Sequence, residues 1–287
     1  MTSHTLPRKK LPIGIQSFAK LRKSGCYYVD KTAFALRLIE QGGYYFLSRP
    51  RRFGKSLFVD TLKELFEGNQ ALFEGLYAEQ HWDWSVQYPV IRLSFGSGIL
   101  QSRAQLDAAI VAQLSLYEKT FAIATVDTEI PYRFKHLIRS VHEHTGQRVV
   151  VLVDEYDKPT LDNLSAPDIA REMRNGLRNL YSVLKDSDAH LKFVFFTGVS
   201  KFSRVNLFSG LNHLRDITLD PRYSALCGYT ETDLDQVFAA ELIGLERHRI
   251  RDWYNGYNWL GEAVYNPFDL LLYFDSHQLK SYWFETG

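Results

Sequence analysis

The sequence predicts an α/β fold in which helices cover both faces of a parallel sheet and give three layers, α/β/α. Two observations indicate this architecture. Short apolar runs of strand length alternate along the chain with longer segments whose apolar residues recur at helical spacing. One of the runs, 149–153, is apolar without interruption, as expected for a strand that is buried on both faces of a parallel sheet.

The chain has 287 residues, enough for one large domain or for a core domain with a smaller appendage. Apolar residues make up 45% of it and aromatic residues 14%, which excludes a disordered polypeptide. No apolar span of 18 residues and no signal-peptide pattern occurs, so we expect a soluble, cytoplasmic protein without a membrane partner. Cys26 and Cys227 fit neither a metal-binding spacing nor a disulfide framework, and we expect reduced, buried thiols. His142 and His144 lack acidic or cysteine partners nearby, and we expect them on the surface.

Charge is distributed unevenly, although the formal net charge is only +1. Residues 1–55 contain twelve Lys or Arg and two Asp or Glu, a net charge of +10, so the remaining residues carry −9. We favour a solvated basic surface that pairs with the acidic remainder. The alternative is direct contact of this basic block with phosphates or nucleic acid. Residues 1–12 are polar and basic, and we expect a flexible arm there.

In the first half of the chain each element follows from its own pattern. A helix is expected before the stop signal Gly42-Gly43, and Asp30 is placed to cap it. The next apolar run has strand length, and apolar residues at helical spacing follow it. The elements expected from there are a strand at 44–48, a helix at 55–67, a short helix within 70–88, a strand at 89–95 and helices at 101–123 and 131–145.

The second half continues this alternation and then changes character. Its expected elements are a strand at 148–155, a helix at 167–186, a strand at 192–197 and a short fifth strand at 217–219. Helices and aromatic loops follow, with Thr230 predicted to cap one helix and Asn266 another, which begins at Pro267. We expect a core domain at 1–223 and a small helical lid subdomain at 224–287, with a further C-terminal domain in a longer protein.

The loop between the first long strand and its helix has the order of a phosphate-binding P-loop, G-x-x-x-x-G-K-[ST]. It departs from that motif at one position, because Arg49 stands in place of the first glycine. In a P-loop the backbone N–H groups and the helix N-terminus hold the phosphates; Lys55 would reach the β- and γ-phosphates, and Ser56 would place its hydroxyl on Mg²⁺. The residues predicted to bind the nucleotide are Arg49, Pro50, Arg51, Arg52, Phe53, Gly54, Lys55, Ser56 and Leu57.

A pair of carboxylates at the end of the buried strand complements this loop. Apolar residues run directly into Asp154 and Glu155, which is the form of a Walker B strand. Asp154 would hold Mg²⁺ through water, and Glu155 would polarise the water that attacks the γ-phosphate. A glutamate in this place favours hydrolysis over transfer of the phosphate to a substrate hydroxyl.

Thr197 ends the next strand, where it is a candidate sensor of the γ-phosphate or of the attacking water. The alternative is a threonine that only caps the strand end. Sites of this kind also use an arginine to neutralise charge on the γ-phosphate, and the sequence leaves several candidates open. They are Arg51, Arg52, Arg174, Arg178, Arg204, Arg249 and Arg251.

Several stretches together resemble the bacterial AAA-ATPase-like family. They are Tyr-Tyr-Val-Asp-Lys-Thr at 27–32, Phe-Leu-Ser-Arg-Pro-Arg-Arg-Phe-Gly-Lys-Ser at 46–56, Val-Asp-Glu-Tyr-Asp-Lys-Pro at 153–159, and the segments 197–202, 253–257, 265–268 and 282–287. The resemblance covers nearly all of residues 10–287 and implies that Arg49 is the family's own form of the loop. It also implies a P-loop NTPase fold of the additional-strand type, and relatedness to archaeal-type and signal-transduction (STAND) ATPases. Family members often carry a PD-(D/E)XK nuclease-like domain after the ATPase.

The leading hypothesis is an ATPase that acts as a nucleotide-gated switch, with ATP and Mg²⁺ as cofactors. Ser56 and Asp154 are its predicted metal ligands, and Glu155, Lys55 and Thr197 its predicted catalytic residues. The partners considered are ATP, other copies of the chain in a homo-oligomer, and DNA bound through the C-terminal domain. A nucleotide-binding scaffold with little turnover is the first alternative, and a P-loop kinase is the second.

Overall fold

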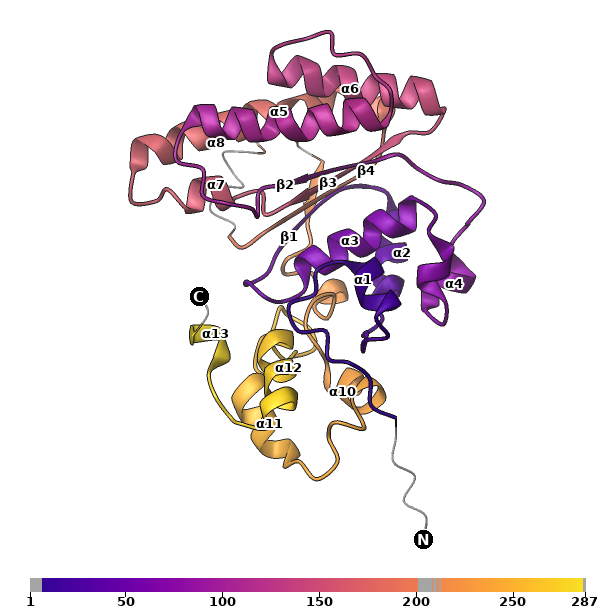
Figure 1. Ribbon diagram of the computed structural model, residues 1–287, viewed down its shortest axis with the longest axis vertical. Coiled ribbons are helices and arrows are strands. Elements are labelled where there is room, and N and C mark those ends of the chain that lie inside the picture. The colour runs from indigo at the N-terminus through magenta and orange to yellow at the C-terminus, as the bar shows by residue number, and fades with distance from the viewer. Residues whose placement is uncertain (1–6, 201–207, 209–210, 212, 286–287) are drawn as a thin grey trace.

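The computed structural model describes residues 7–200, 208, 211 and 213–285 (Figure 1). Five strands form one sheet in which every pair of neighbours is parallel. The strands are β1 (Gly43–Ser48), β2 (Val90–Ser94), β3 (Val149–Asp154), β4 (Leu191–Gly198) and β5 (Leu214–Asp216). The predicted α/β fold with a parallel sheet is therefore confirmed.

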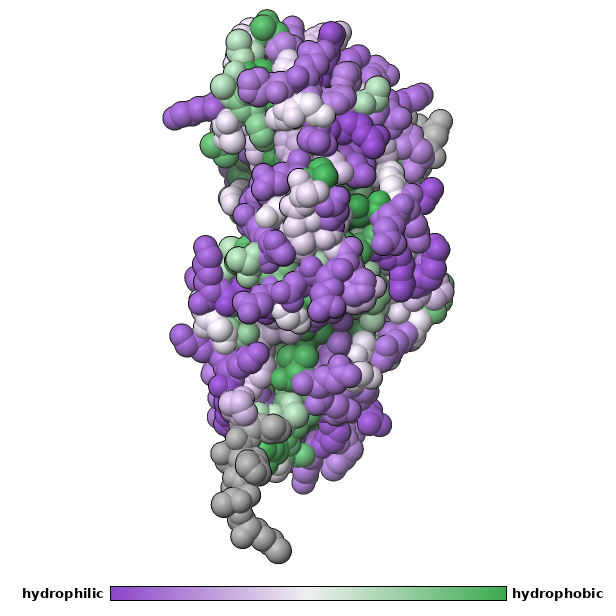
Figure 2. All heavy atoms as spheres, turned by 90° about the vertical axis from the view of Figure 1, so that its right-hand side faces the viewer, coloured by the Kyte–Doolittle hydropathy of each residue, from purple (hydrophilic) through white to green (hydrophobic). Residues whose placement is uncertain are grey.

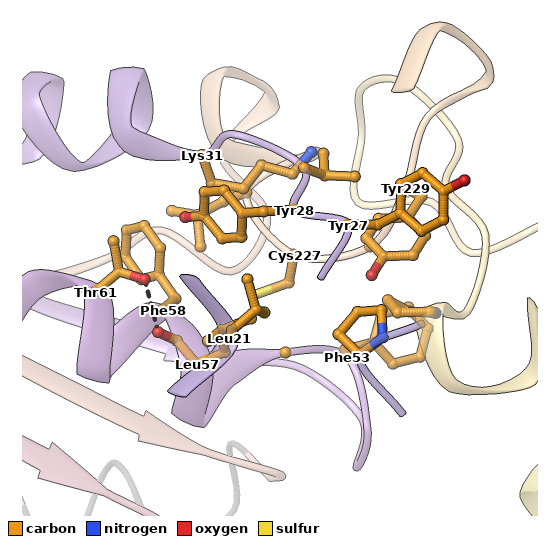
Figure 3. Close-up of a pocket in the computed structure, with 16 residues that line it drawn as sticks. Leu21, Tyr27, Tyr28, Lys31, Phe53, Leu57, Phe58, Thr61, Cys227 and Tyr229 are labelled. Carbon is orange, nitrogen blue, oxygen red and sulfur yellow. Dashed lines mark hydrogen bonds between the residues drawn. The ribbon is translucent and has the colours of Figure 1, made fainter. Parts of the chain in front are cut away.

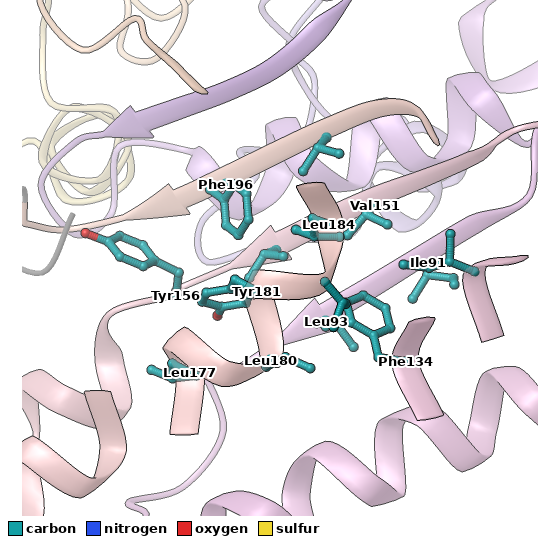
Figure 4. Packing of buried hydrophobic residues seen from close by; sticks show 14 of the residues in the cluster. Ile91, Leu93, Phe134, Val151, Tyr156, Leu177, Leu180, Tyr181, Leu184 and Phe196 are labelled. Carbon is teal, nitrogen blue, oxygen red and sulfur yellow. The ribbon is translucent and has the colours of Figure 1, made fainter. Parts of the chain in front are cut away.

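Helices cover both faces of this sheet. Three long helices pack on one face: α5 (Arg103–Thr120), α6 (Ile130–Thr145) and α8 (Pro167–Asp186). Figure 4 shows apolar side chains of this layer packed against the strands. The other face packs against α1 (Phe18–Lys23), α2 (Thr32–Gln41), α3 (Lys55–Phe66), η1 (Gln70–Phe73) and α4 (Tyr77–His81). Alternate residues of β3 serve the two layers: Val151 and Val153 belong to the first core, Val150 and Leu152 to the second.

The strand order is β2-β3-β4-β1-β5, which places β4 between the strands that end at the predicted loop and at Asp154. A strand in this place agrees with the additional-strand type of P-loop fold that the family resemblance implies. Leu47 of β1 lies beside Thr197 of β4, and Phe196 of β4 lies beside Val153 of β3. Because parallel strands have their carboxyl ends at the same edge of a sheet, the loops after β1, β3 and β4 meet there.

Side chains of α5 cover the outer edge of β2. The hydroxyl group of Tyr117 accepts a hydrogen bond from the backbone N–H of Arg92 at 2.8 Å and donates one to its carbonyl oxygen at 2.9 Å. The side-chain oxygen of Gln113 accepts from the N–H of Ser94 at 2.7 Å. The N–H and carbonyl groups of Arg92 and the N–H of Ser94, on the outer side of this edge strand, are thereby paired.

The short fifth strand differs from the prediction. The sequence pattern predicts it at 217–219, whereas β5 ends at Asp216. Ile217 still donates its N–H to the carbonyl oxygen of Phe46 at 3.0 Å, but the next N–H, of Thr218, donates to the side chain of Asp216 at 2.9 Å. The N–H of Ser48, which would continue the pairing from β1, donates to the side-chain hydroxyl of Thr218 at 3.0 Å, and the strand ends there. The other strands and the long helices begin and end within three residues of their predicted bounds.

The residues after β5 form a group of helices with a core of their own. They are α10 (Glu231–Val237), α11 (Arg247–Tyr254), α12 (Pro267–Ser276) and α13 (Tyr282–Glu285). The short η3 (Pro221–Tyr223) precedes them, and its Tyr223 packs in the core of the α3 layer. The predicted caps are confirmed, since the side chains of Thr230 and Asn266 accept backbone hydrogen bonds at the starts of α10 and α12. Tyr27 and Val29 of the N-terminal segment belong to the same core. These C-terminal helices therefore pack against the N-terminal segment. Their role as a lid stays a prediction.

Within the described part of the chain, no helix combines the length and the apolar character needed to cross a bilayer. Figure 2 shows hydrophilic side chains over most of the face that it presents. Cys26 and Cys227 are buried and free, as predicted. His144 is exposed, whereas the partly buried His142 has its Nδ1 atom 2.9 Å from Nδ1 of His190.

Candidate functional site

The loop between β1 and α3 turns through two left-handed backbone positions. Gly54 has a φ of 88° and directly precedes α3, and Arg52 has a φ of 68°. Glycine adopts this left-handed conformation without strain, so Gly54 fits it readily, whereas it is uncommon for a residue with a side chain such as Arg52. The loop therefore leads to the start of α3, where the first backbone N–H groups lack partners within the helix.

Lys55, the first residue of α3, is buried, with 5% of its surface exposed. Its ammonium group donates hydrogen bonds to the carbonyl oxygens of Arg49 at 2.9 Å and Pro50 at 2.8 Å. Burial lowers the pKa of Lys55, and the nearby negative charges of Asp154 and Glu155 oppose this effect. The ammonium group is thus held by the loop, within electrostatic range of the carboxylates at the end of β3.

Arg49 is buried, and its side chain is directed at backbone carbonyl groups. Its guanidinium donates hydrogen bonds to the carbonyl oxygens of Ser48 and Thr218, both at 2.9 Å, and of Tyr223 at 3.1 Å. It also lies 4.0 Å from the ring centroid of Trp259. The side chain that replaces the first glycine of the motif therefore connects the loop to the segment after β5 and to Trp259 in the loop between α11 and α12. Its φ is not positive, so a side chain fits there without backbone strain.

Two further side chains of the loop reach the C-terminal part. Phe53 packs edge-on against Tyr257, with ring centroids 4.6 Å apart, and against Trp259 at 5.5 Å. The guanidinium of Arg52 lies 4.1 Å from the ring centroid of Phe268 at the start of α12. Arg51 is exposed. Sequence reasoning did not predict these contacts between the loop and the aromatic residues of the C-terminal part. The signal for them in the sequence was the cluster of aromatic residues after residue 252.

Asp154 ends β3 with a carboxylate that is almost fully buried. One of its oxygens accepts a hydrogen bond from the hydroxyl of Thr197 at 2.6 Å, which confirms that the ends of β3 and β4 lie side by side. The other oxygen lies 3.4 Å from a guanidinium nitrogen of Arg92, a β2 residue that sequence reasoning did not single out. Thr197 is itself fully buried, so its hydroxyl acts on Asp154 in this structure.

Glu155 follows Asp154 in the left-handed region, with a φ of 55°. Its side chain is half-buried and lies close to Gly96, where an added Cβ would come within 3.1 Å of a carboxylate oxygen. Burial raises the pKa of Glu155, and the charge of Asp154 raises it further. A carboxylate whose pKa is raised in this way is better suited to accept a proton from water.

The segment after Glu155 is bonded to the loop that follows β4. The buried carboxylate of Asp157 accepts hydrogen bonds from the backbone N–H groups of Val199 and Ser200, the latter at 2.7 Å. The hydroxyl of Tyr156 donates to the carbonyl oxygen of Ser200 at 2.9 Å. A Cβ added to Gly198 would lie 2.4 Å from the ring of Tyr156, so any other residue at that position would have to displace the ring. Asp157 and Gly198 were not predicted as site residues.

An apolar pocket lies next to the loop (Figure 3). It is lined by the N-terminal segment, the end of the loop and the start of α3, the segment before α10, and Pro267 at the start of α12. The aromatic rings of Tyr28 and Tyr229 and the thiol of Cys227 face it together with Leu57. Gly54, where the chain enters α3, belongs to its lining. Sequence reasoning missed this pocket, because its walls are about 200 residues apart along the chain.

The predicted metal ligands are the carboxylate of Asp154 and the hydroxyl of Ser56. In the described residues no group of three or more His, Cys, Asp or Glu side chains could hold a metal ion by itself. This donor set fits Mg²⁺, which is commonly held by one or two protein oxygens together with water and substrate phosphates.

The arginines considered for neutralising charge on the γ-phosphate have different surroundings in the structure. Arg249 and Arg251 of α11 form ion pairs with Glu246 at 3.4 Å and Glu231 at 3.0 Å. Arg51 lies close enough to Glu155 for its charge to oppose the raised pKa of that residue. The other candidates are Arg52, described above, Arg174 and Arg178 on α8, and Arg204, which lies outside the described residues.

Comparison with known proteins gives two matches. A family described as predicted AAA-ATPase matches residues 12–208. A protein of Azotobacter chroococcum mcd 1, described as an uncharacterized protein in the vnfD 5′ region, is 64% identical over 283 residues. That match covers 98% of this chain and 55% of the other protein, so the chain spans about half the length of this relative. No solved structure matches the chain.

Proposed function

The chain belongs to the predicted AAA-ATPase family, and from this premise we propose that it binds ATP and hydrolyses it with Mg²⁺. One observation supports the proposal most. The ammonium group of Lys55 is buried on the loop, and the Asp154–Glu155 pair is near enough to act on its pKa. A loop cation and a strand-end carboxylate pair are what nucleotide hydrolysis requires at its phosphate site.

The residues have separate roles in this proposal. The backbone of residues 49–54 and the start of α3 hold the phosphates, and Lys55 exchanges its two carbonyl partners for phosphate oxygens. Asp154 and Ser56 hold Mg²⁺, which when bound would neutralise charge on the phosphates. Glu155 orients the attacking water and accepts its proton. We place Thr197 as a positioning residue, because its hydroxyl reaches the site through Asp154.

We further propose that the adenine base enters the pocket beside Gly54. The pocket is mainly apolar and offers the rings of Tyr28 and Tyr229, as a planar base requires. Its position next to the loop would let one nucleotide place its base there and its phosphates on α3. The base would then contact both the N-terminal segment and the segment before α10.

A second candidate function is a nucleotide-binding switch with little turnover. It is favoured by the contacts of Arg49, Arg52 and Phe53 with the C-terminal helices, because a change in the loop would be transmitted to them. In the whole protein we propose that such a change controls a C-terminal effector, with a nuclease-like domain that acts on DNA as the form that the family resemblance suggests.

ATP binding and phosphate release should be measured on the wild type, Lys55→Ala and Glu155→Gln. We expect Lys55→Ala to lose binding, and Glu155→Gln to bind ATP while phosphate release falls at least about 100-fold. Lys119→Ala and Glu172→Gln are matched controls, since both side chains are exposed on the outer helices. Equal rates in the wild type and both site variants would reject hydrolysis at this site. Tight binding without phosphate release would favour the switch, and phosphate transfer to an acceptor would favour a kinase.

A further inference from the structure

Arg92 lies between two carboxylates that belong to different elements. One guanidinium nitrogen is 2.6 Å from an oxygen of Asp60 on α3, and the other is 3.4 Å from an oxygen of Asp154 at the end of β3. Arg92 shares its face of β2 with Val90, whose side chain packs in the α3 layer. The arginine therefore approaches the predicted metal ligand from the edge of the sheet.

The two ion pairs are unequal. The bond to Asp60 is short, and the second oxygen of Asp60 accepts from the backbone N–H of Phe18 at 2.7 Å, so this carboxylate is fixed. The bond to Asp154 is long, and that carboxylate has a shorter partner in Thr197. Within the described part of the chain, Nε of Arg92 is buried without a hydrogen-bond partner. The guanidinium is thus held mainly by Asp60 and remains within reach of Asp154.

We propose that Arg92 is a positioning residue whose resident positive charge sets the affinity of Asp154 for a divalent cation. The proposal rests on the proposed function, in which Asp154 holds Mg²⁺. Asp60 restrains the arginine at a distance from Asp154, so the carboxylate keeps an oxygen that a cation can approach. The charge of Arg92 repels that cation and keeps the affinity low until nucleotide phosphates supply further ligands.

This arrangement predicts that substitutions of Arg92 and of Asp60 change the affinity for a divalent cation in opposite directions. Removing the charge in Arg92→Gln should tighten binding of a divalent cation to the nucleotide-free protein by about tenfold, from the Coulomb energy of one single and one double positive charge about 6 Å apart in a water-like dielectric. Asp60→Asn releases Arg92 from its shorter partner and removes a nearby negative charge, so it should weaken binding. Arg92→Lys keeps the charge and should stay closer to the wild type than Arg92→Gln does.

The test is a titration of the nucleotide-free protein with Mn²⁺, followed by the electron paramagnetic resonance signal of the free ion. Arg139→Gln is the matched control, because Arg139 is an exposed arginine that pairs with Glu143 at 2.7 Å on α6. Thermal unfolding of each variant shows that it is folded.

Tighter binding in Arg92→Gln together with weaker binding in Asp60→Asn would support the inference. A purely structural role would loosen Asp154 in both variants, and weaker or unchanged binding in Arg92→Gln would overturn the inference. If Arg92→Gln does not fold, Asp60→Asn decides alone, and equal or tighter binding there overturns it. Failure of the proposed function is a separate result, because it appears as absent phosphate release by a wild type that still binds Mn²⁺.

Discussion

Replacing Arg49 by alanine tests whether the residue that departs from the P-loop motif is a structural part of this loop. The truncation removes three hydrogen bonds from the guanidinium to backbone carbonyl oxygens of Ser48, Thr218 and Tyr223. It also removes the contact with the ring of Trp259. We expect a loss of global stability and a looser connection between the loop and the C-terminal helices.

The size of the loss follows from opposing contributions. Hydrogen bonds from a charged donor contribute about 1.5 kcal/mol each at the low end, so three contribute about 4.5 kcal/mol. The contact with Trp259 adds about 1 kcal/mol. Against this, burial lowers the pKa of Arg49 to about 10, which corresponds to about 3 kcal/mol against the charged form in the folded state. The net expectation is that Arg49→Ala lowers the free energy of unfolding by about 2–3 kcal/mol.

Urea unfolding at neutral pH, followed by tryptophan fluorescence, measures this change. Arg51→Ala is the matched control, since Arg51 is an exposed arginine of the same loop and should change stability by less than about 0.5 kcal/mol. Arg49→Lys should recover only part of the loss, because an ammonium group cannot reproduce the planar fork that serves three carbonyl groups. An Arg49→Ala protein as stable as Arg51→Ala would refute the reasoning.

Three further predictions concern Gly198 at the end of β4, Asp269 in the first turn of α12 and Leu57 in the lining of the pocket. Gly198→Ala should lower the free energy of unfolding by about 1–3 kcal/mol, because its Cβ would meet the ring of Tyr156 at 2.4 Å; an unchanged thermal midpoint would show that the ring can move aside. Burial raises the pKa of Asp269 to about 6, because it disfavours the charged carboxylate in the folded state. The stability that comes from keeping this group protonated is fully present below about pH 4 and is lost as the pH rises through about 6. The free energy of unfolding of Asp269→Asn, relative to that of the wild type, should therefore rise by about 1–2 kcal/mol between these pH values in urea titrations. A difference that does not change with pH would contradict the raised pKa of Asp269. Leu57→Trp should fill the pocket and weaken binding of ATP at least about tenfold while binding of inorganic triphosphate stays unchanged; calorimetry on both ligands checks this, and equal losses for both would place the base elsewhere.

Much of the fold could be predicted because its signals are local. Strands such as 149–153 are continuous apolar runs, and long helices such as α8 have a clear apolar period. The loop and the carboxylates were also visible, because each lies directly at the end of a strand. The fifth strand was misplaced because the backbone N–H of Ser48 on β1 bonds to the side-chain hydroxyl of Thr218, so the pairing does not continue into the predicted segment 217–219.

The contacts that shape the site could not be predicted in the same way. Arg92 and Asp60 lie on different elements, and nothing in either segment alone indicates their ion pair. The sequence shows that Arg49 replaces a glycine, but the carbonyl groups of Thr218 and Tyr223 that bind its side chain come about 170 residues later. Such pairs depend on the packing of elements that are distant along the chain.

The way in which α5 meets the edge strand β2 has a consequence for association between molecules. An exposed edge strand offers unpaired N–H and carbonyl groups to which a strand of another chain can add, which leads to aggregation. Gln113 and Tyr117 are four residues apart on a helix, about 6 Å along its axis, and Arg92 and Ser94 are two residues apart on a strand, about 6.6 Å. The two repeats nearly match, so one turn of α5 presents hydrogen-bonding side chains at the spacing of an additional strand. The helix thereby blocks strand addition at this edge and leaves the sheet closed to a neighbouring copy there.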